Sequence, residues 1–92
     1  MIQEAINRIE QMETYFDALQ EAVKIDPELL IANPRLKCYL QSLVLYYEGG
    51  QWLKDYELDE MGVLPKDLKR GVLAQDAVYD FLEQIKHVND IS

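Results

Sequence analysis

The stretch PRLKCYLQSLVLYYEGG, residues 34–50, decides the fold that we expect for this chain. Its apolar residues recur every three or four positions, and further apolar residues flank this stripe, so that most sides of a helix here would be apolar. The stripe holds Leu36, Tyr39, Leu40, Leu43, Val44 and Tyr47, and the flanks hold Cys38, Leu45 and Tyr46. A helix of this kind is buried by neighbours on most sides, which belong either to this chain or to a second copy of it. We therefore expect residues 34–48 at the centre of the core, ended by Gly49 and Gly50.

Residues 2–25 precede this stretch and carry one continuous helical stripe of apolar side chains. The stripe consists of Ile2, Ala5, Ile9, Met12, Phe16, Leu19 and Val23. It suits a coiled-coil seam as well as packing within the chain, and we expect the second. Asp26-Pro27 ends this helix and can begin the next helical turn. Asn33-Pro34 has the same two roles at the next break. We therefore expect residues 28–32 to form a short helical turn between the two breaks.

The C-terminal half is expected to hold two short helical segments and one longer helix. Residues 51–61 form the first segment, closed by Gly62, and residues 66–70 form a turn opened by Pro65 and closed by Gly71. An amphipathic stripe of Val78, Phe81, Leu82, Ile85 and Val88 predicts the last helix, from near residue 74 to 89. No two-residue alternation persists, so no sheet is expected. The fold class is a single all-α domain over residues 1–92, a small bundle of three main helices, 2–25, 34–48 and 74–89.

The formal charge of −8 over 92 residues limits the classes of partner. It argues against binding to nucleic acid, which requires clustered Lys and Arg, and against an anionic membrane surface. We expect no signal peptide, and no apolar run is long enough to span a bilayer. A single cysteine, Cys38, excludes an internal disulfide and favours a cytoplasmic location. A DNA mimic is a weaker hypothesis that rests on the charge alone.

The pattern YY…W…DYE.DE.G.LP.DLKRGVL..DAVYD, from Tyr46 to Asp80, resembles the signature of a small bacterial family known as domain of unknown function 4298. The resemblance is strong in this region and weak in the first helix. It implies a small soluble bacterial protein, and it supplies no activity, cofactor or catalytic residue.

Five residues of this region have no evident backbone role and are the candidate binding surface: Trp52, Asp55, Tyr56, Lys69 and Arg70. Aromatic residues are favoured at interface centres, although aromatics at helical spacing also form cores. The basic pair follows a block of acids, with which it can form surface ion pairs, or it can bind an anionic group of a partner, with Arg70 in a bidentate contact.

The block of acids consists of Asp55, Glu57, Asp59 and Glu60, and such oxygen-rich clusters can hold calcium or magnesium. The spacing fails as an EF-hand loop, because Glu60 stands where glycine is needed and Lys66 where a bidentate glutamate is needed. We predict no metal site and no cofactor. The alternative function is nevertheless a binder of a small ligand or divalent metal, or an undetected enzyme, that uses this block together with Asp76.

Catalysis has little support in the sequence. His87 is the only histidine and suits the negative end of the last helix, Ser42 has no nucleophile-elbow context, and Cys38 has no histidine near it in sequence. We therefore expect no catalytic residues and a non-enzymatic interaction or regulatory module that uses residues 46–80 to bind a protein partner. The choice between monomer and homodimer stays open.

Overall fold

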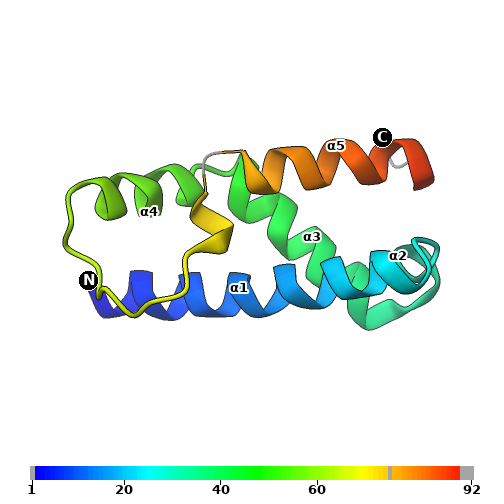
Figure 1. Cartoon of the computed structure of the whole chain (residues 1–92), viewed down its shortest axis with the longest axis horizontal. Helices are drawn as coiled ribbons and strands as arrows, with labels where there is room; N and C mark the ends of the chain where they lie inside the picture. Colours follow the sequence, from blue (N-terminus) through cyan, green and yellow to red (C-terminus); the bar gives the residue numbers. More distant parts are fainter. Residues whose placement is uncertain (1, 75, 90–92) are drawn as a thin grey trace.

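Helix α1, Ile2–Ile25, runs along the full length of the molecule (Figure 1). The computed structural model describes residues 2–74 and 76–89. A helix of 24 residues is about 36 Å long, which matches the longest dimension of 38 Å. The expected bounds are confirmed, and the buried side of α1 follows the predicted stripe from Ala5 to Leu19, with Glu13 added. At the ends of the stripe, Ile2 is exposed and Ala22 is buried in place of Val23.

The two Pro-containing breaks also fold as the sequence predicts. The carboxylate of Asp26 accepts a hydrogen bond from the Glu28 N–H, and helix α2, Leu29–Ala32, follows as a single turn. Helix α3, Pro34–Glu48, then begins with proline at its first position, and the side chain of Asn33 accepts from the N–H groups of Arg35 and Leu36. Asn33 thus satisfies two donors that the first turn of α3 leaves free, whereas α2 has no side-chain cap.

Within one chain, neighbouring elements do not surround α3 on most sides. Only Leu40, Leu43 and Tyr46 of this helix are buried, whereas Cys38 is exposed and Leu45 keeps 73% of its surface exposed. Helix α3 crosses from the layer of α1 to the opposite layer (Figure 1), and its outer face meets no other described element closely enough to be covered. A chain of 92 residues has too few helices to enclose one of them, and the long α1 contributes more of the core.

Helices α4, Gln51–Glu60, and α5, Ala77–Asn89, lie end to end in the layer opposite α1 (Figure 1). Gly50 and Gly62 flank α4 with φ of 95° and 74°, in the left-handed region that favours glycine. The described chain thus has four helices of ten residues or more instead of the expected three. Helix α5 starts three residues later than expected, directly after Asp76. The side chains of His87 and Val88 fall outside the described part.

The connection between α4 and α5 differs most from the expectation. Pro65 opens a turn in which the Leu68 N–H donates to the Pro65 carbonyl at 3.3 Å, but residues 66–70 form no helix, and a 3₁₀ helix, η1, lies at Gly71–Leu73. Residues 61–70, which we call the link, leave the far end of α4, return along the N-terminal half of α1 and enter η1 between the two layers (Figure 1). The link therefore places Leu64 and Leu68 in the core.

Buried side chains from both layers and from the link form one hydrophobic cluster. Val72, Val78 and Ile85 join it from η1 and α5, and the Phe16 and Phe81 rings meet edge to face at 5.4 Å between centroids. The described residues contain no strand, and the fold is all-α as expected. Of the helices in residues 2–74 and 76–89, none combines the length and the apolar character that crossing a bilayer requires.

Candidate functional site

Asp55, one of the five candidate surface residues, is fully buried. Arg8 of α1 donates to both of its carboxylate oxygens, from Nε at 2.9 Å and from an outer nitrogen at 2.5 Å, and the Tyr46 hydroxyl donates to it at 2.8 Å. Buried charges persist only when they are paired and hydrogen-bonded, and these three bonds meet that requirement. Asp55 is therefore not part of a binding surface; it joins α1, α3 and α4.

The same cluster changes the acid–base behaviour of its members. Burial, followed by the hydrogen bond to Asp55, raises the pKa of Tyr46 well above its ordinary value of 10.0. The hydrogen bonds to Asp55 likewise raise the pKa of Arg8, although burial acts in the opposite direction. Tyr46 therefore stays a neutral donor and Arg8 a cation across the physiological range.

A second buried acid, Glu13, fixes η1 against α1. Glu13 is only 5% exposed, and its Oε1 accepts a hydrogen bond from the Val72 N–H. The carbonyl of Val72 accepts from the indole N–H of Trp52 at 2.8 Å, so both polar backbone groups of Val72 are bonded to side chains of different helices. A Cβ on Gly71 would lie 3.1 Å from Glu13 Oε1. Gly71 thus allows close approach of η1 to α1 and does not serve the expected left-handed turn.

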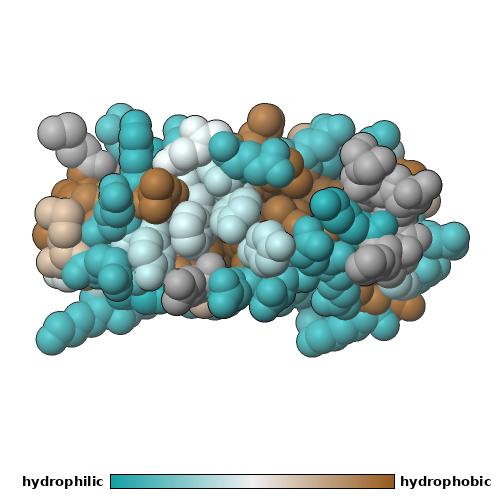
Figure 2. Space-filling view, turned by 90° about the horizontal axis from the view of Figure 1, so that it is seen from above, coloured by the Kyte–Doolittle hydropathy of each residue, from teal (hydrophilic) through white to brown (hydrophobic). Residues whose placement is uncertain are grey.

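Trp52 is the middle member of an aromatic column. Its ring stacks on Tyr56 at 5.1 Å and meets the edge of Tyr47 at 5.2 Å, and all three side chains are half-buried. Because the indole N–H already donates to the Val72 carbonyl, the column has no free indole donor for a partner. The face over α4 and α5 shows side chains of intermediate hydropathy near its middle, with hydrophilic side chains and hydrophobic patches around them (Figure 2).

Arg70 holds the link in shape from within. Its guanidinium forms an ion pair with Asp59 at 2.5 Å, donates from Nε to the Leu68 carbonyl at 3.3 Å, and donates to the Pro65 carbonyl. The pair with Asp59 is the contact with the acidic block that the sequence offers as one of two alternatives, and all three guanidinium nitrogens take part in bonds within the chain. A planar fork of this kind fixes both ends of a short loop, which a lysine cannot do.

Lys69, in contrast, is exposed and reaches across to α1. Its Nζ lies 2.7 Å from a carboxylate oxygen of Asp17 and 3.9 Å from Oε2 of Glu13. The hydrogen bond to Asp17 raises the pKa of Lys69, so the ammonium charge persists here. Exposed ion pairs contribute little to stability. The pair of Lys69 and Asp17 instead lies at one end of a groove between α1 and the link.

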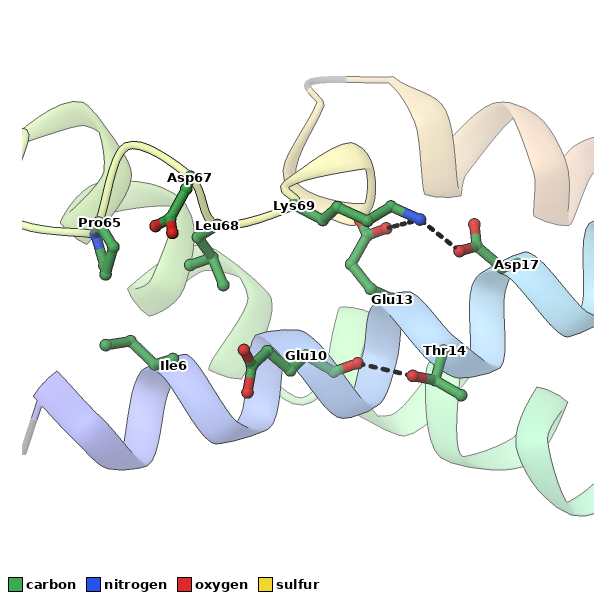
Figure 3. Close-up of a pocket in the computed structure, with 9 residues that line it drawn as sticks. All are labelled: Ile6, Glu10, Glu13, Thr14, Asp17, Pro65, Asp67, Leu68 and Lys69. Atoms are coloured by element: carbon green, nitrogen blue, oxygen red, sulfur yellow. Dashed lines mark hydrogen bonds and ion pairs between the residues drawn. The ribbon is translucent and has the colours of Figure 1, made fainter.

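The groove lies between residues 6–17 of α1 and the link, and has a volume of about 380 Å³ (Figure 3). Helix α1 lines it with Ile6, Glu10, Glu13, Thr14 and Asp17. The link lines it with Pro65, Asp67, Leu68 and Lys69. The apolar members lie together at one end, and the ion pair of Lys69 and Asp17 lies at the other (Figure 3).

The groove carries an excess of negative charge. Its four carboxylates face a single ammonium group, which leaves a formal charge of −3. Within the part of the chain that the structure describes, the exposed carboxylates of Glu10 and Asp67 have no hydrogen-bond or ion-pair partner, and both point into the groove (Figure 3). The groove therefore holds two carboxylates that are free to meet a cation.

Of the five candidate residues, only Lys69 lines the groove. The wall of the groove on α1 was not predicted from the sequence, although one residue there indicated a buried contact. Glu13 falls inside the apolar stripe, between Met12 and Phe16, where a solvated acid is out of place. An acid within a buried stripe indicates a partner group on another element, which here is the Val72 N–H.

The acidic block of α4 is not assembled into a metal site. Asp55 is buried against Arg8 and Asp59 is paired with Arg70, whereas Asp76 precedes α5. Across residues 2–74 and 76–89, no three carboxylate, histidine or cysteine side chains are placed so that they could hold a metal ion.

Comparisons with known proteins identify a family. No curated protein and no solved structure matches the chain significantly. The sequence model of one family matches residues 9–90, from the second turn of α1 to just beyond α5, which covers most of both walls of the groove. The chain therefore belongs to the family described as Domain of unknown function (DUF4298).

Proposed function

We propose that this protein is an interaction module that holds a segment of a partner protein in the groove between α1 and the link. The single observation that supports the proposal is a preformed groove with a fixed wall. Arg70 binds two carbonyls of the link, and Glu13 and Trp52 fix Val72 directly after it. A wall that is rigid before binding loses little entropy when a partner arrives.

The groove suits binding better than catalysis. Thr14 is the only hydroxyl among its lining residues, and it donates to the backbone carbonyl of Glu10 at 3.1 Å. The only amine, Lys69, is held by Asp17. Among the described residues that line the groove, no nucleophile is thus paired with a base, which is the arrangement that acyl or phosphoryl transfer requires.

The proposal extends to where the protein acts and what it avoids. We infer a cytoplasmic location in a bacterial cell, supported by the exposed and unpaired Cys38, which a reducing compartment keeps as a thiol. The net charge of −8 supports a protein partner over a nucleic acid. The module acts as a monomer or as a homodimer, and the groove is complete within one chain.

Site-specific photocrosslinking in the native cells tests the proposal. A photoreactive amino acid replaces Thr14, which is exposed and lines the groove, and in a matched variant it replaces Gln41, which is equally exposed on α3 and lies outside it. We expect a discrete protein adduct from position 14 that position 41 does not give. The same adduct pattern from both positions, or none from position 14, would refute the proposal.

A further inference from the structure

The groove combines an apolar end with unpaired negative charge, and this combination specifies its occupant. Ile6 and Leu68 lie at the apolar end, and Glu10 and Asp67 direct their carboxylates into the space beside them (Figure 3). A purely apolar groove would accept any hydrophobic side chain, and an exposed acidic patch would attract any cation. The two together favour a group with an apolar stem and a cationic end.

The ammonium group of Lys69 does not neutralise the four carboxylates of the groove. Lys69 lies at 2.7 Å from Asp17 but at 3.9 Å from Glu13, so its hydrogen bond goes to Asp17. Glu13 is buried and accepts from the Val72 N–H through Oε1, and among the described residues the one cation near its Oε2 is this more distant ammonium group. A buried carboxylate that is only partly neutralised gains energy when a further cation approaches.

Lysine and arginine side chains meet both requirements, since their methylene stems cover apolar surface while the charged end stays at a polar rim. The volume of about 380 Å³ is near the lower end of the range of ligand pockets. It accommodates one or two side chains of an extended segment, whereas the face of a folded partner is too large. Acidic and phosphorylated segments would be repelled by the four carboxylates.

We propose that the groove recognises an arginine or lysine side chain of an extended segment of the partner protein. The stem lies on Ile6 and Leu68, and the cationic group lies between Glu10 and Asp67. This inference rests on the proposed function, since it names the chemistry of the partner segment held in the same groove. Arginine is the better fit, because its guanidinium can bind two carboxylates at once.

Peptide pools of defined central residue test the recognition. Three pools of nine-residue peptides share degenerate flanking positions and carry arginine, its neutral isostere citrulline, or glutamate at the centre. Each is added to ¹⁵N-labelled protein, and amide shifts are followed by NMR. We expect the arginine pool to shift amides of residues 6–17 and 65–69, with at least about tenfold weaker apparent binding of the citrulline pool and none of the glutamate pool.

Paired variants show whether the groove carboxylates are responsible. Glu10→Gln with Asp67→Asn should abolish the preference for arginine over citrulline. The control, Glu48→Gln with Asp80→Asn, makes the same change in net charge at exposed acids outside the groove and should keep the preference. All four side chains are exposed, so the fold is expected to survive both pairs of substitutions.

Each other outcome overturns the inference. Equal shifts from the arginine and citrulline pools would show that the positive charge of the central residue does not contribute to binding. The absence of shifts from every pool would show that no such segment binds. Shifts of the same amides by millimolar magnesium or calcium, without shifts from the arginine pool, would assign the carboxylates to a divalent cation instead. Crosslinking at position 14 would still succeed in the first of these cases, which separates failure of this inference from failure of the proposed function.

Discussion

Replacing Arg8 by methionine should destabilise the protein strongly, because it leaves Asp55 charged and buried. Asp55 is 0% exposed and receives two of its three side-chain hydrogen bonds from Arg8. Removing one partner of a buried ion pair typically costs about 3–5 kcal/mol of unfolding free energy. The Arg8 side chain is 27% exposed, so water can partly replace it, and we expect about 3 kcal/mol, the lower end of that range.

Urea unfolding followed by the fluorescence of Trp52, the only tryptophan, measures this loss. With a dependence of roughly 1–3 kcal/mol per molar urea, the midpoint should fall by roughly 1–3 M. Arg35→Met is the matched control, since Arg35 is exposed at the start of α3 and its substitution removes the same charge. It should change the unfolding free energy by less than about 0.5 kcal/mol.

A triple variant checks the physical reason. Arg8→Met, Asp55→Leu and Tyr46→Phe together remove every polar group of the cluster, so no buried charge or donor stays unpaired. Apolar replacement of a complete buried ion pair is often neutral or stabilising, so the triple variant should be more stable than Arg8→Met alone. The reasoning is refuted if Arg8→Met costs less than about 1 kcal/mol, or if the triple variant is as unstable as the single one.

Three further predictions use the same unfolding measurements or hydrogen exchange. The pKa of Tyr46 is raised above 10.0 in the folded protein, so Tyr46 keeps its proton there while the unfolded chain loses it. Above pH 10 the unfolding free energy of the unsubstituted protein should therefore fall relative to that of Tyr46→Phe, by up to about 1.4 kcal/mol per pH unit. A difference between the two proteins that does not change with pH would contradict this. Gly71→Ala should cost about 1–2 kcal/mol through crowding of Glu13 and should become neutral or stabilising when Glu13 is alanine, where equal costs in both backgrounds would exclude the contact. Arg70→Lys should weaken the link by about 1 kcal/mol, seen as faster amide exchange at Leu68 than in the unsubstituted protein, and unchanged exchange would show that the fork does not hold the link.

The local helix signals were sufficient for much of the fold. Residues 2–25 and 34–48 form the helices that their periodicity predicts, and Asn33 caps the second of them as its place before Pro34 indicates. These signals act through contacts between residues at most four positions apart, which the sequence itself contains. The count of main helices was too low, because α4 has few apolar residues and its stability depends on packing that the pattern does not show.

The candidate site could not be predicted in the same way. Asp55 belongs to an acidic block and was assigned to the surface, yet it is buried because Arg8, 47 residues earlier, meets it. For Arg70 the sequence leaves open an ion pair with the acidic block or a contact with a partner's anion, and the structure shows the first, with Asp59, together with bonds to two carbonyls of its own link. A charged side chain looks the same in sequence whether its partner is solvent, another molecule or a distant residue of the same chain.

The sequence by itself determined an all-α chain, the ends of its first three helices, the family, and an acidic balance that disfavours nucleic acid. These properties follow from short-range periodicity, capping and composition. Only the tertiary structure decided which acids are buried, that Gly71 serves close packing against Glu13, and that the link returns along α1 to form a groove. Residues 34–48 illustrate the difference. They form the helix that their pattern predicts, but the burial of this helix depends on how few neighbouring elements a short chain can place around it.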